Sequence, residues 1–366
     1  MKFDIATRKG LFSVSRKARG EWQIETAEFL GDNVSMVLND RRTGTTFAAL
    51  DHGHFGVKMH AREAGGSWRE IATPAYPPKP EGLEENDMWG RPLPWSTVRV
   101  WALEPGGSDE PGTLWCGTIP GALFKTRDNG ASWQIVEPLW RHPKRREWMG
   151  GGADLPGLHS VAVDPRNSRA VTVAVSTGGL WHTDDGGETW SQRGEGMRAE
   201  HVPPELTHAP IAQDVHALAR CPASPERMWV QHHNGIFVSS DAGRTFHEIT
   251  EVQPSAFGFA VVVHPTDPDT AWFVPEIKDE KRIPVDGRLV VTRTRDGGRS
   301  FETLTRGLPQ QHAYDIVYRH ALALSEDGTT LAFGSTTGSI YVSEDQGDSW
   351  SCVSHSLPPV YCVRFS

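Results

Sequence analysis

An eight-residue segment that ends in an aromatic residue recurs seven times along this chain of 366 residues. Five copies follow the pattern Ser/Thr-x-Asp-x-Gly-x-x-Trp/Phe, and two copies keep only part of it. The complete copies are residues 126–133, 183–190, 239–246, 294–301 and 343–350, and the partial copies are 15–22 and 61–68. Successive terminal aromatic residues lie 46 to 65 residues apart, which is the length of one propeller blade with loops of variable size.

The repeated segment has the composition of a turn that closes by itself. Its hydroxyl group and its Asp carboxylate can both accept hydrogen bonds from nearby backbone N–H groups. Glycine at the fifth position suits a backbone with positive φ, and the closing aromatic residue can pack between neighbouring sheets. Because many equivalent turns are typical of a scaffold, we interpret these Asp residues as structural rather than as catalytic or calcium-binding groups.

The intervals between repeats each contain four apolar segments with the character of strands. Residues 1–30 hold only three such segments, and residues 360–366 supply a fourth. We therefore predict an all-β, seven-bladed β-propeller of four-stranded antiparallel blades, in which the C-terminal strand completes the N-terminal blade. The whole chain, 1–366, is predicted to be one domain. The other expected blades are residues 31–75, 96–138, 157–193, 214–251, 256–305 and 314–357.

Charge and cysteine content restrict the partners that we expect. The net charge of -9 and the lack of a basic run longer than 144–146 argue against nucleic-acid binding. Neither a signal peptide nor an apolar stretch of membrane-spanning length is recognisable, so no membrane association is expected. The four cysteines, Cys116, Cys221, Cys352 and Cys362, have no CxxC spacing and are interpreted as reduced thiols. We expect a cytoplasmic protein.

Four long insertions are expected to lie together at one mouth of the propeller channel, at residues 76–95, 139–156, 194–214 and 276–287. Trp89, Trp95, Trp140 and Trp148 lie in these insertions. Flat aromatic rings beside polar groups bind sugar rings, but they also attach long loops to a scaffold. Both interpretations remain open. The tryptophans on predicted strands, Trp115, Trp181, Trp229 and Trp272, are explained by packing.

The predicted inner strands place several polar side chains at one level of the channel. Alignment of these strands puts Arg99, His159, His216, Phe259 and His320 at equivalent positions. Nearby connections add further candidates, namely Arg198, Glu200, His201, His232, His233, His312, Tyr314, Asp315 and Arg319.

Three chemical roles are open for these residues. His159, His216 and His320 could hold a divalent metal ion, which is the one cofactor that we consider. Alternatively, a metal-free site would use His159, His216 and Tyr314 as acid–base catalysts, with arginines pairing an anionic group. As a third reading, the polar groups satisfy one another and channel water. The predicted ligand-binding residues are Arg99, Arg198, Glu200, His232, His233, His312, Arg319, His320, Trp140 and Trp148.

Because of its five complete repeats, the chain resembles bacterial propellers with Asp-box (neuraminidase) repeats, which are sialidase-like or glycosyl-hydrolase-like proteins. It is also similar to photosystem II assembly factors, xyloglucan-degrading Asp-box enzymes and sortilin-type receptors. These resemblances imply the fold more firmly than an activity. Sialidases have six blades and a Phe-Arg-Ile-Pro motif near the N-terminus. The nearest segment here, Lys281-Arg282-Ile283-Pro284, lies in an insertion of the sixth blade, so no sialidase role is transferred.

The resemblance to xyloglucan-degrading enzymes implies a pair of catalytic carboxyl groups. Seven residues are candidates for this pair: Glu85, Asp87, Asp154, Glu200, Asp214, Glu276 and Asp315. The leading hypothesis is a propeller that binds a small polar ligand, such as a saccharide or sugar acid, and hydrolyses or eliminates it. The alternative is a non-catalytic interaction or assembly propeller that docks a protein partner.

Overall fold

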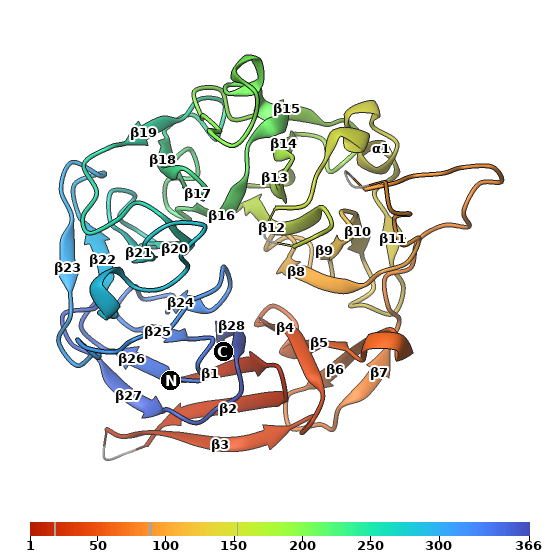
Figure 1. Cartoon of the computed structure of the whole chain (residues 1–366). Helices are drawn as coiled ribbons and strands as arrows, with labels where there is room; N and C mark the ends of the chain where they lie inside the picture. Colours follow the sequence, from red (N-terminus) through yellow and green to blue (C-terminus); the bar gives the residue numbers. More distant parts are fainter. Residues whose placement is uncertain (18–19, 88–89, 152) are drawn as a thin grey trace. The chain divides into compact units, whose positions relative to one another are not determined.

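The computed structural model describes residues 1–17, 20–87, 90–151 and 153–366. These residues form seven four-stranded antiparallel sheets, and the fold is a seven-bladed β-propeller (Figure 1). The described residues divide into two compact units. Unit 1 comprises Met1–Val37 and His216–Ser366, and unit 2 comprises Leu38–Val215. The prediction of a single domain with the blade boundaries given above stays a prediction.

Four of the sheets belong to unit 1. The first has the strand order β28-β1-β2-β3, and the others run in chain order from β16, β20 and β24. The strands are β1 (Lys2–Thr7), β2 (Gly10–Arg16), β3 (Trp22–Glu28), β16 (Val215–Arg220), β17 (Met228–His232), β18 (Gly235–Ser239), β19 (His247–Ile249), β20 (Gly258–Val263), β21 (Ala271–Pro275), β22 (Val291–Thr294), β23 (Glu302–Leu304), β24 (Leu322–Leu324), β25 (Leu331–Gly334), β26 (Ile340–Ser343), β27 (Ser351–Ser354) and β28 (Val360–Phe365).

Three sheets belong to unit 2, apart from residues 33–37 of β4, which are part of unit 1. Their strands are β4 (Asn33–Asp40), β5 (Thr45–Asp51), β6 (Val57–Glu63), β7 (Arg69–Ile71), β8 (Arg99–Pro105), β9 (Leu114–Ile119), β10 (Leu123–Thr126), β11 (Gln134–Ile135), β12 (Gly157–Asp164), β13 (Asn167–Ser176), β14 (Gly179–Thr183) and β15 (Ser191–Arg193). The described helices are α1 (Glu137–Trp140) and the 3₁₀ turns η1 (Gly53–Phe55), η2 (Pro143–Glu147), η3 (Pro204–Leu206), η4 (Pro210–Ala212) and η5 (Val285–Gly287). Each described helix is too short to cross a bilayer.

The C-terminal strand completes the N-terminal sheet, as predicted. The strands β28 and β1 lie side by side (Figure 1). In this antiparallel pair, Phe3 lies opposite Phe365 and Ile5 lies opposite Val363. The edge of β1 that faces away from β2 is therefore hydrogen-bonded rather than open.

The five complete repeats form the predicted turn. In residues 239–246, the Asp241 carboxylate accepts hydrogen bonds from the Ser239 hydroxyl at 2.8 Å and from the Thr245 backbone at 2.9 Å. Gly243, at the fifth position, has a φ of 81°, which L side chains seldom adopt. The same bonds recur in residues 294–301, where the Ser300 hydroxyl and backbone lower the pKa of Asp296 to about 2. The Asp carboxylate of each complete repeat therefore accepts hydrogen bonds within its own turn.

Replacing Asp241 by alanine is expected to lower the free energy of unfolding by about 1–2 kcal/mol, because three hydrogen-bond donors of the turn lose their acceptor. Urea denaturation measures this change. Arg244, which is exposed in the same turn, is the matched control, and its replacement by alanine should have little effect. Equal stabilities of the two variants would contradict a structural role for the carboxylate.

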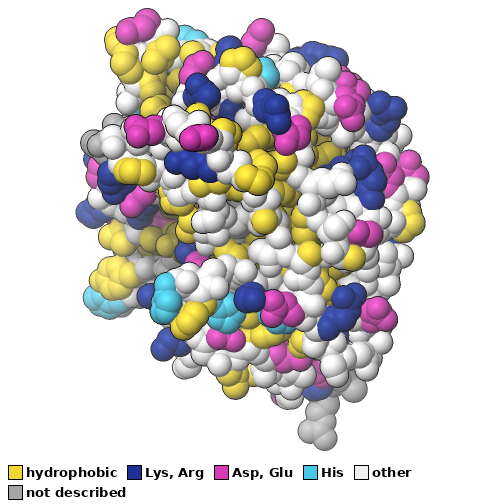
Figure 2. Space-filling model, turned by 90° about the vertical axis from the view of Figure 1, so that its right-hand side faces the viewer, with side chains coloured by type: hydrophobic (Ala, Val, Ile, Leu, Met, Phe, Trp, Pro, Cys, Tyr) yellow, Lys and Arg dark blue, Asp and Glu magenta, His cyan; other side chains and the backbone are white. Residues whose placement is uncertain are grey.

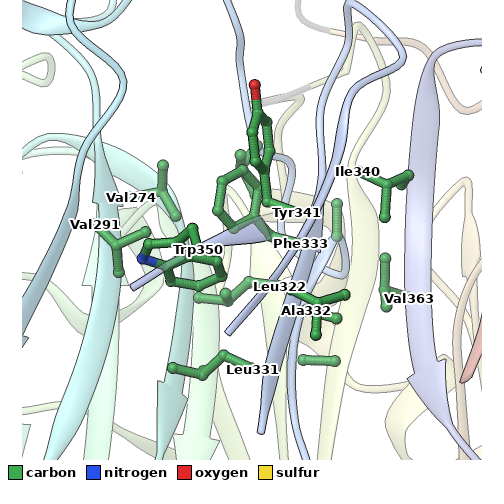
Figure 3. Packing of buried hydrophobic residues seen from close by; sticks show 14 of the residues in the cluster. Val274, Val291, Leu322, Leu331, Ala332, Phe333, Ile340, Tyr341, Trp350 and Val363 are labelled. Carbon is green, nitrogen blue, oxygen red and sulfur yellow. The ribbon is translucent and has the colours of Figure 1, made fainter. Parts of the chain in front are cut away.

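The core consists of aromatic and aliphatic side chains between the sheets. Four tryptophans on strands, Trp115, Trp181, Trp229 and Trp272, have no exposed surface, which confirms the packing role predicted for them. In unit 1 the ring of Phe333 lies 5.1 Å from that of Tyr341 and 4.9 Å from that of Trp350 (Figure 3). Such contacts attach the closing aromatic residue of a repeat to its own sheet.

The surface carries charges of both signs. On the face shown in Figure 2, basic and acidic side chains lie among one another rather than in separate areas of one charge. This mixed distribution does not favour a polyanion such as nucleic acid on that face.

Candidate functional site

His216 lies in a cluster of aromatic rings in unit 1. It is the second residue of β16, is 2% exposed, and stacks on Phe259 of β20 with ring centroids 4.7 Å apart. Its Nδ1 lies 2.7 Å from the carbonyl oxygen of Gly258. Since a carbonyl oxygen only accepts, Nδ1 carries the hydrogen, and a neutral ring has its lone pair on Nε2. His216 therefore has the tautomer of a potential base at Nε2.

The two adjacent histidines after β17 have different environments. The half-buried ring of His233 lies edge-on to His216 at 5.5 Å and to Phe257 at 5.9 Å. The His232 ring is fully buried, lies edge-on to Phe237 at 5.2 Å, and accepts a hydrogen bond from the backbone of Asn234. The His233 ring therefore contacts His216, whereas the His232 ring accepts a hydrogen bond within its own turn.

Two arginines approach the ring of Phe259. The guanidinium of Arg319, a buried residue, lies 5.6 Å from the ring centroid, and that of the exposed Arg282 lies 5.4 Å from it. Arg282 also pairs with Asp279 in the same insertion. Two guanidinium groups thus lie near the Phe259 ring, on which His216 stacks.

Glu276 and Asp315 form a pair of buried carboxyl groups. Glu276 follows β21, is 1% exposed, and donates its backbone N–H to the carbonyl oxygen of Phe257. Burial, and secondarily the negative charge of Asp315, raise the pKa of Glu276 to about 9, while the backbone of Val317 acts in the opposite direction. Glu276 is therefore protonated at neutral pH.

Asp315 is oriented by hydroxyl groups. Its carboxylate accepts a hydrogen bond from the Ser335 hydroxyl at 2.7 Å and another from the Thr337 hydroxyl. The Asp315 side chain is buried next to the protonated Glu276. The carbonyl oxygen of Phe257 accepts from the Glu276 backbone, and the Phe257 ring lies 5.7 Å from that of His216. On this link we group Glu276, Asp315, His216, Phe259 and Arg319 as the acid–base cluster.

The remaining predicted residues of unit 1 are more dispersed. Tyr314 is 55% exposed, and His312 is exposed with a φ of 53°. His320 is half-buried and precedes β24, where it forms a bridge to Cys362 of β28. Whereas His216 lies within an inner strand, His320 lies outside one, so the strand alignment does not give the two residues equivalent positions.

In unit 2, several predicted residues already have partners. His159 of β12 is fully buried, with Nδ1 2.9 Å from the Ser160 hydroxyl and its ring 5.5 Å from that of Trp101. Arg99, the first residue of β8, pairs with Asp51 at 3.0 Å. Arg198 pairs with Glu200. A role of these groups in ligand binding, and a metal ion on His159, His216 and His320, stay predictions.

Unit 2 contains a groove between the insertions 76–95 and 139–156. Two adjoining cavities, of about 560 and 430 Å³, share the lining residues Glu85, Trp95, Trp140, Arg145 and Arg146. Arg145 lies 4.0 Å above the Trp140 ring and pairs with Glu85 at 2.8 Å. In the sequence, Arg145 and Arg146 stand out only as part of a basic run, and their nearness to Trp140 in the same insertion was the available signal.

The tryptophans of the insertions separate into two kinds. Trp148 is 6% exposed and packs edge-on against Trp181 at 5.8 Å, so it fixes its loop to the sheet. Trp95 and Trp140 are half-buried and line both cavities. Trp89 lies outside the described residues.

Comparison with known proteins gives the fold class. No protein-family model matches the chain. A xyloglucanase of Hypocrea jecorina (strain QM6a) is 28% identical over 144 residues, which is 37% of this chain and 16% of that protein. An ancestral GH74 enzyme superposes with a TM-score of 0.56 at 14% identity, covering 87% of this chain and 38% of the enzyme. YCF48 bound to D1 peptide gives 0.53 at 12% identity, covering 87% of this chain and 80% of that chain.

These similarities show a shared β-propeller. They do not show a family. This chain matches well under half of the length of both sugar-related proteins.

Proposed function

We propose that the protein cleaves a saccharide or sugar acid by acid–base catalysis, with Glu276 as the acid and Asp315 as the complementary carboxylate. The observation that carries this proposal is the pairing of two buried carboxyl groups in different environments. Carboxyl pairs whose environments separate their protonation states are typical of catalytic acids and bases.

Each step of glycoside cleavage has a candidate group in the cluster. The reaction needs a carboxylic acid that protonates the leaving oxygen, and a carboxylate that activates water or attacks the anomeric carbon. Glu276 carries a proton at neutral pH. Asp315 accepts hydrogen bonds from Ser335 and Thr337, which would hold it in one orientation.

A sugar acid would also use the two basic residues of the acid–base cluster. Arg319 would pair with the substrate carboxylate, since a guanidinium group matches a carboxylate in geometry and charge. Nε2 of His216 would remove the proton next to that carboxylate in an elimination, while Glu276 protonates the departing oxygen. Hydrolysis and elimination thus share the same acid.

Access to the acid–base cluster requires a local movement. Glu276 is 1% exposed and begins the insertion 276–287, whose exposed Arg282 lies over Phe259. Displacement of this insertion would open the cluster and exclude bulk water again on closing. The similarities to a xyloglucanase and to a GH74 enzyme support a saccharide as the substrate class.

The alternative function is docking of a protein partner. It is supported by the similarity to YCF48 bound to D1 peptide, which extends over 80% of that chain. A docking propeller would not need the acid–base cluster. Variants of Glu276 and Asp315 therefore separate the two functions.

Glu276→Gln and Asp315→Asn are expected to lower kcat by about 100-fold or more, because each removes one group of the acid–base pair. The wild type is first screened with xyloglucan oligosaccharides, aryl glycosides and polyuronates, by release of reducing ends or of unsaturated products. Activity should also fall as the pH rises through the pKa of Glu276, about 9, because the acid then loses its proton.

Glu280→Gln is the control, since Glu280 lies in the same insertion and is exposed. It should retain the activity of the wild type. Turnover that survives in both carboxyl variants, or a wild type inactive on every substrate, would reject the proposal.

A further inference from the structure

We propose that the larger cavity of the unit 2 groove is a binding site for a carboxylated saccharide, namely an oligosaccharide that ends in a single uronate. The inference rests on the proposed saccharide function and adds a substrate class. It uses residues of unit 2 only.

The aromatic wall of this groove is held in place without a ligand. Trp95 lies edge-on to Trp140 with centroids 5.4 Å apart, and Tyr76 lies 5.0 Å from Trp140. The indole N–H of Trp95 donates to the carbonyl oxygen of Pro77 at 2.7 Å. Because the rings are already fixed and remain half-exposed, binding to them costs little conformational entropy. Rigid indole and proline surfaces suit the C–H faces of sugar rings.

The charges of the larger cavity favour an anion. Its acidic lining residues are Glu85 and Glu137, and its arginines are Arg141, Arg145 and Arg146. Arg141 pairs with Glu137, and Arg145 pairs with Glu85 at 2.8 Å. Each carboxylate therefore already has an arginine partner.

Arg146 is the arginine in excess. It reaches the same Glu85 only at 3.8 Å, and its side chain is 70% exposed. A guanidinium in this position can form two parallel hydrogen bonds with a carboxylate of the ligand. The cavity of about 560 Å³ lies within the range of small-molecule sites.

The additional charged groups of the adjoining cavity are acidic. Glu84, Asp87, Glu147 and Asp154 line it in addition to the shared residues. A polyanion spanning both cavities would meet these acids, so the carboxylate that binds should be near one end of the ligand, over Arg146. This asymmetry distinguishes a uronate-terminated saccharide from a strongly acidic peptide.

The test is calorimetric titration of the full chain carrying Glu276→Gln, so that the probe is not consumed. The probes are a short neutral oligosaccharide with one terminal galacturonate and its methyl ester, which has the same rings without the negative charge. We expect the uronate-terminated probe to bind at least tenfold more tightly than the ester. Arg146→Gln should weaken its binding about tenfold or more, and added salt should weaken binding to the unsubstituted groove.

Arg127→Gln, an exposed substitution in a repeat turn of the same unit, is the control and should leave binding unchanged. Equal binding of acid and ester, no loss with Arg146→Gln, or no binding of either probe would overturn the inference. Tighter binding of an oligoglutamate peptide would also overturn it and assign the groove to a protein partner. The groove is tested by binding of the probe and the acid–base cluster by the kcat of Glu276→Gln. Failure of one proposal can therefore be distinguished from failure of the other.

Discussion

Glu276→Gln is expected to stabilise the protein at neutral and alkaline pH. In the unfolded chain a glutamate ionises near pH 4.3, whereas folded Glu276 keeps its proton up to about pH 9. The native state therefore binds more protons than the unfolded state between these values, and the stability falls as the pH rises. Glutamine does not titrate. At pH 7 the variant should gain about 3 kcal/mol relative to its difference from the wild type at pH 4.

Urea denaturation of both proteins at pH 4, 7 and 9 measures this difference. Glu251→Gln, at an exposed position of unit 1, should show no such pH-dependent gain. If Glu276→Gln destabilises the protein equally at all three values, Glu276 is ionised in the folded state. Combined with the activity assay, a variant that is more stable and less active would identify a site where function is maintained at the expense of stability.

Trp272→Ala is expected to lower the free energy of unfolding by about 3–5 kcal/mol, because it removes a fully buried indole from the core. The indole N–H also donates to the carbonyl oxygen of Gln346 at 2.8 Å, which ties β21 to the turn of the last repeat. Trp272→Phe should lose less, about 1–3 kcal/mol, because the ring keeps most of its contacts and loses the hydrogen bond.

Denaturant unfolding with fluorescence detection measures both variants. Trp68, in a partial repeat, is only half-buried and is the matched control. Its replacement by alanine should cost clearly less than that of Trp272. A cost for Trp68→Ala as large as that for Trp272→Ala would contradict burial as the reason for the cost.

The fold could be predicted because its determinants are local. Ser239, Asp241 and Gly243 determine their turn by bonds within eight residues, and the same bonds recur in each complete copy. The assignment of Val360–Phe365 to the first sheet followed from a missing strand, and the pairing of β28 with β1 confirms it. Propeller repeats therefore reveal their architecture even where blades differ in length.

The candidate site was harder to predict than the fold, because its interacting residues are distant from one another in the sequence. Glu276 and Asp315 were two of seven carboxyl candidates, and only the structure gives the burial that raises the pKa of Glu276. The role of Arg99 depends on Asp51, 48 residues away. The sequence alignment put His320 level with His216, whereas His320 lies in an irregular segment before β24, outside a strand. Trp148 could not be distinguished from Trp140 without knowledge of burial.

The β28–β1 pair also constrains the order of events during synthesis. Residues 2–7 leave the ribosome more than 350 residues before their hydrogen-bonding partner, Val360–Phe365. Until then β1 has an unpaired edge, which can capture strands of other nascent chains. We therefore expect the first sheet to mature only after translation has passed residue 365, and this chain to need protection from aggregation longer than a propeller whose first sheet is continuous in sequence.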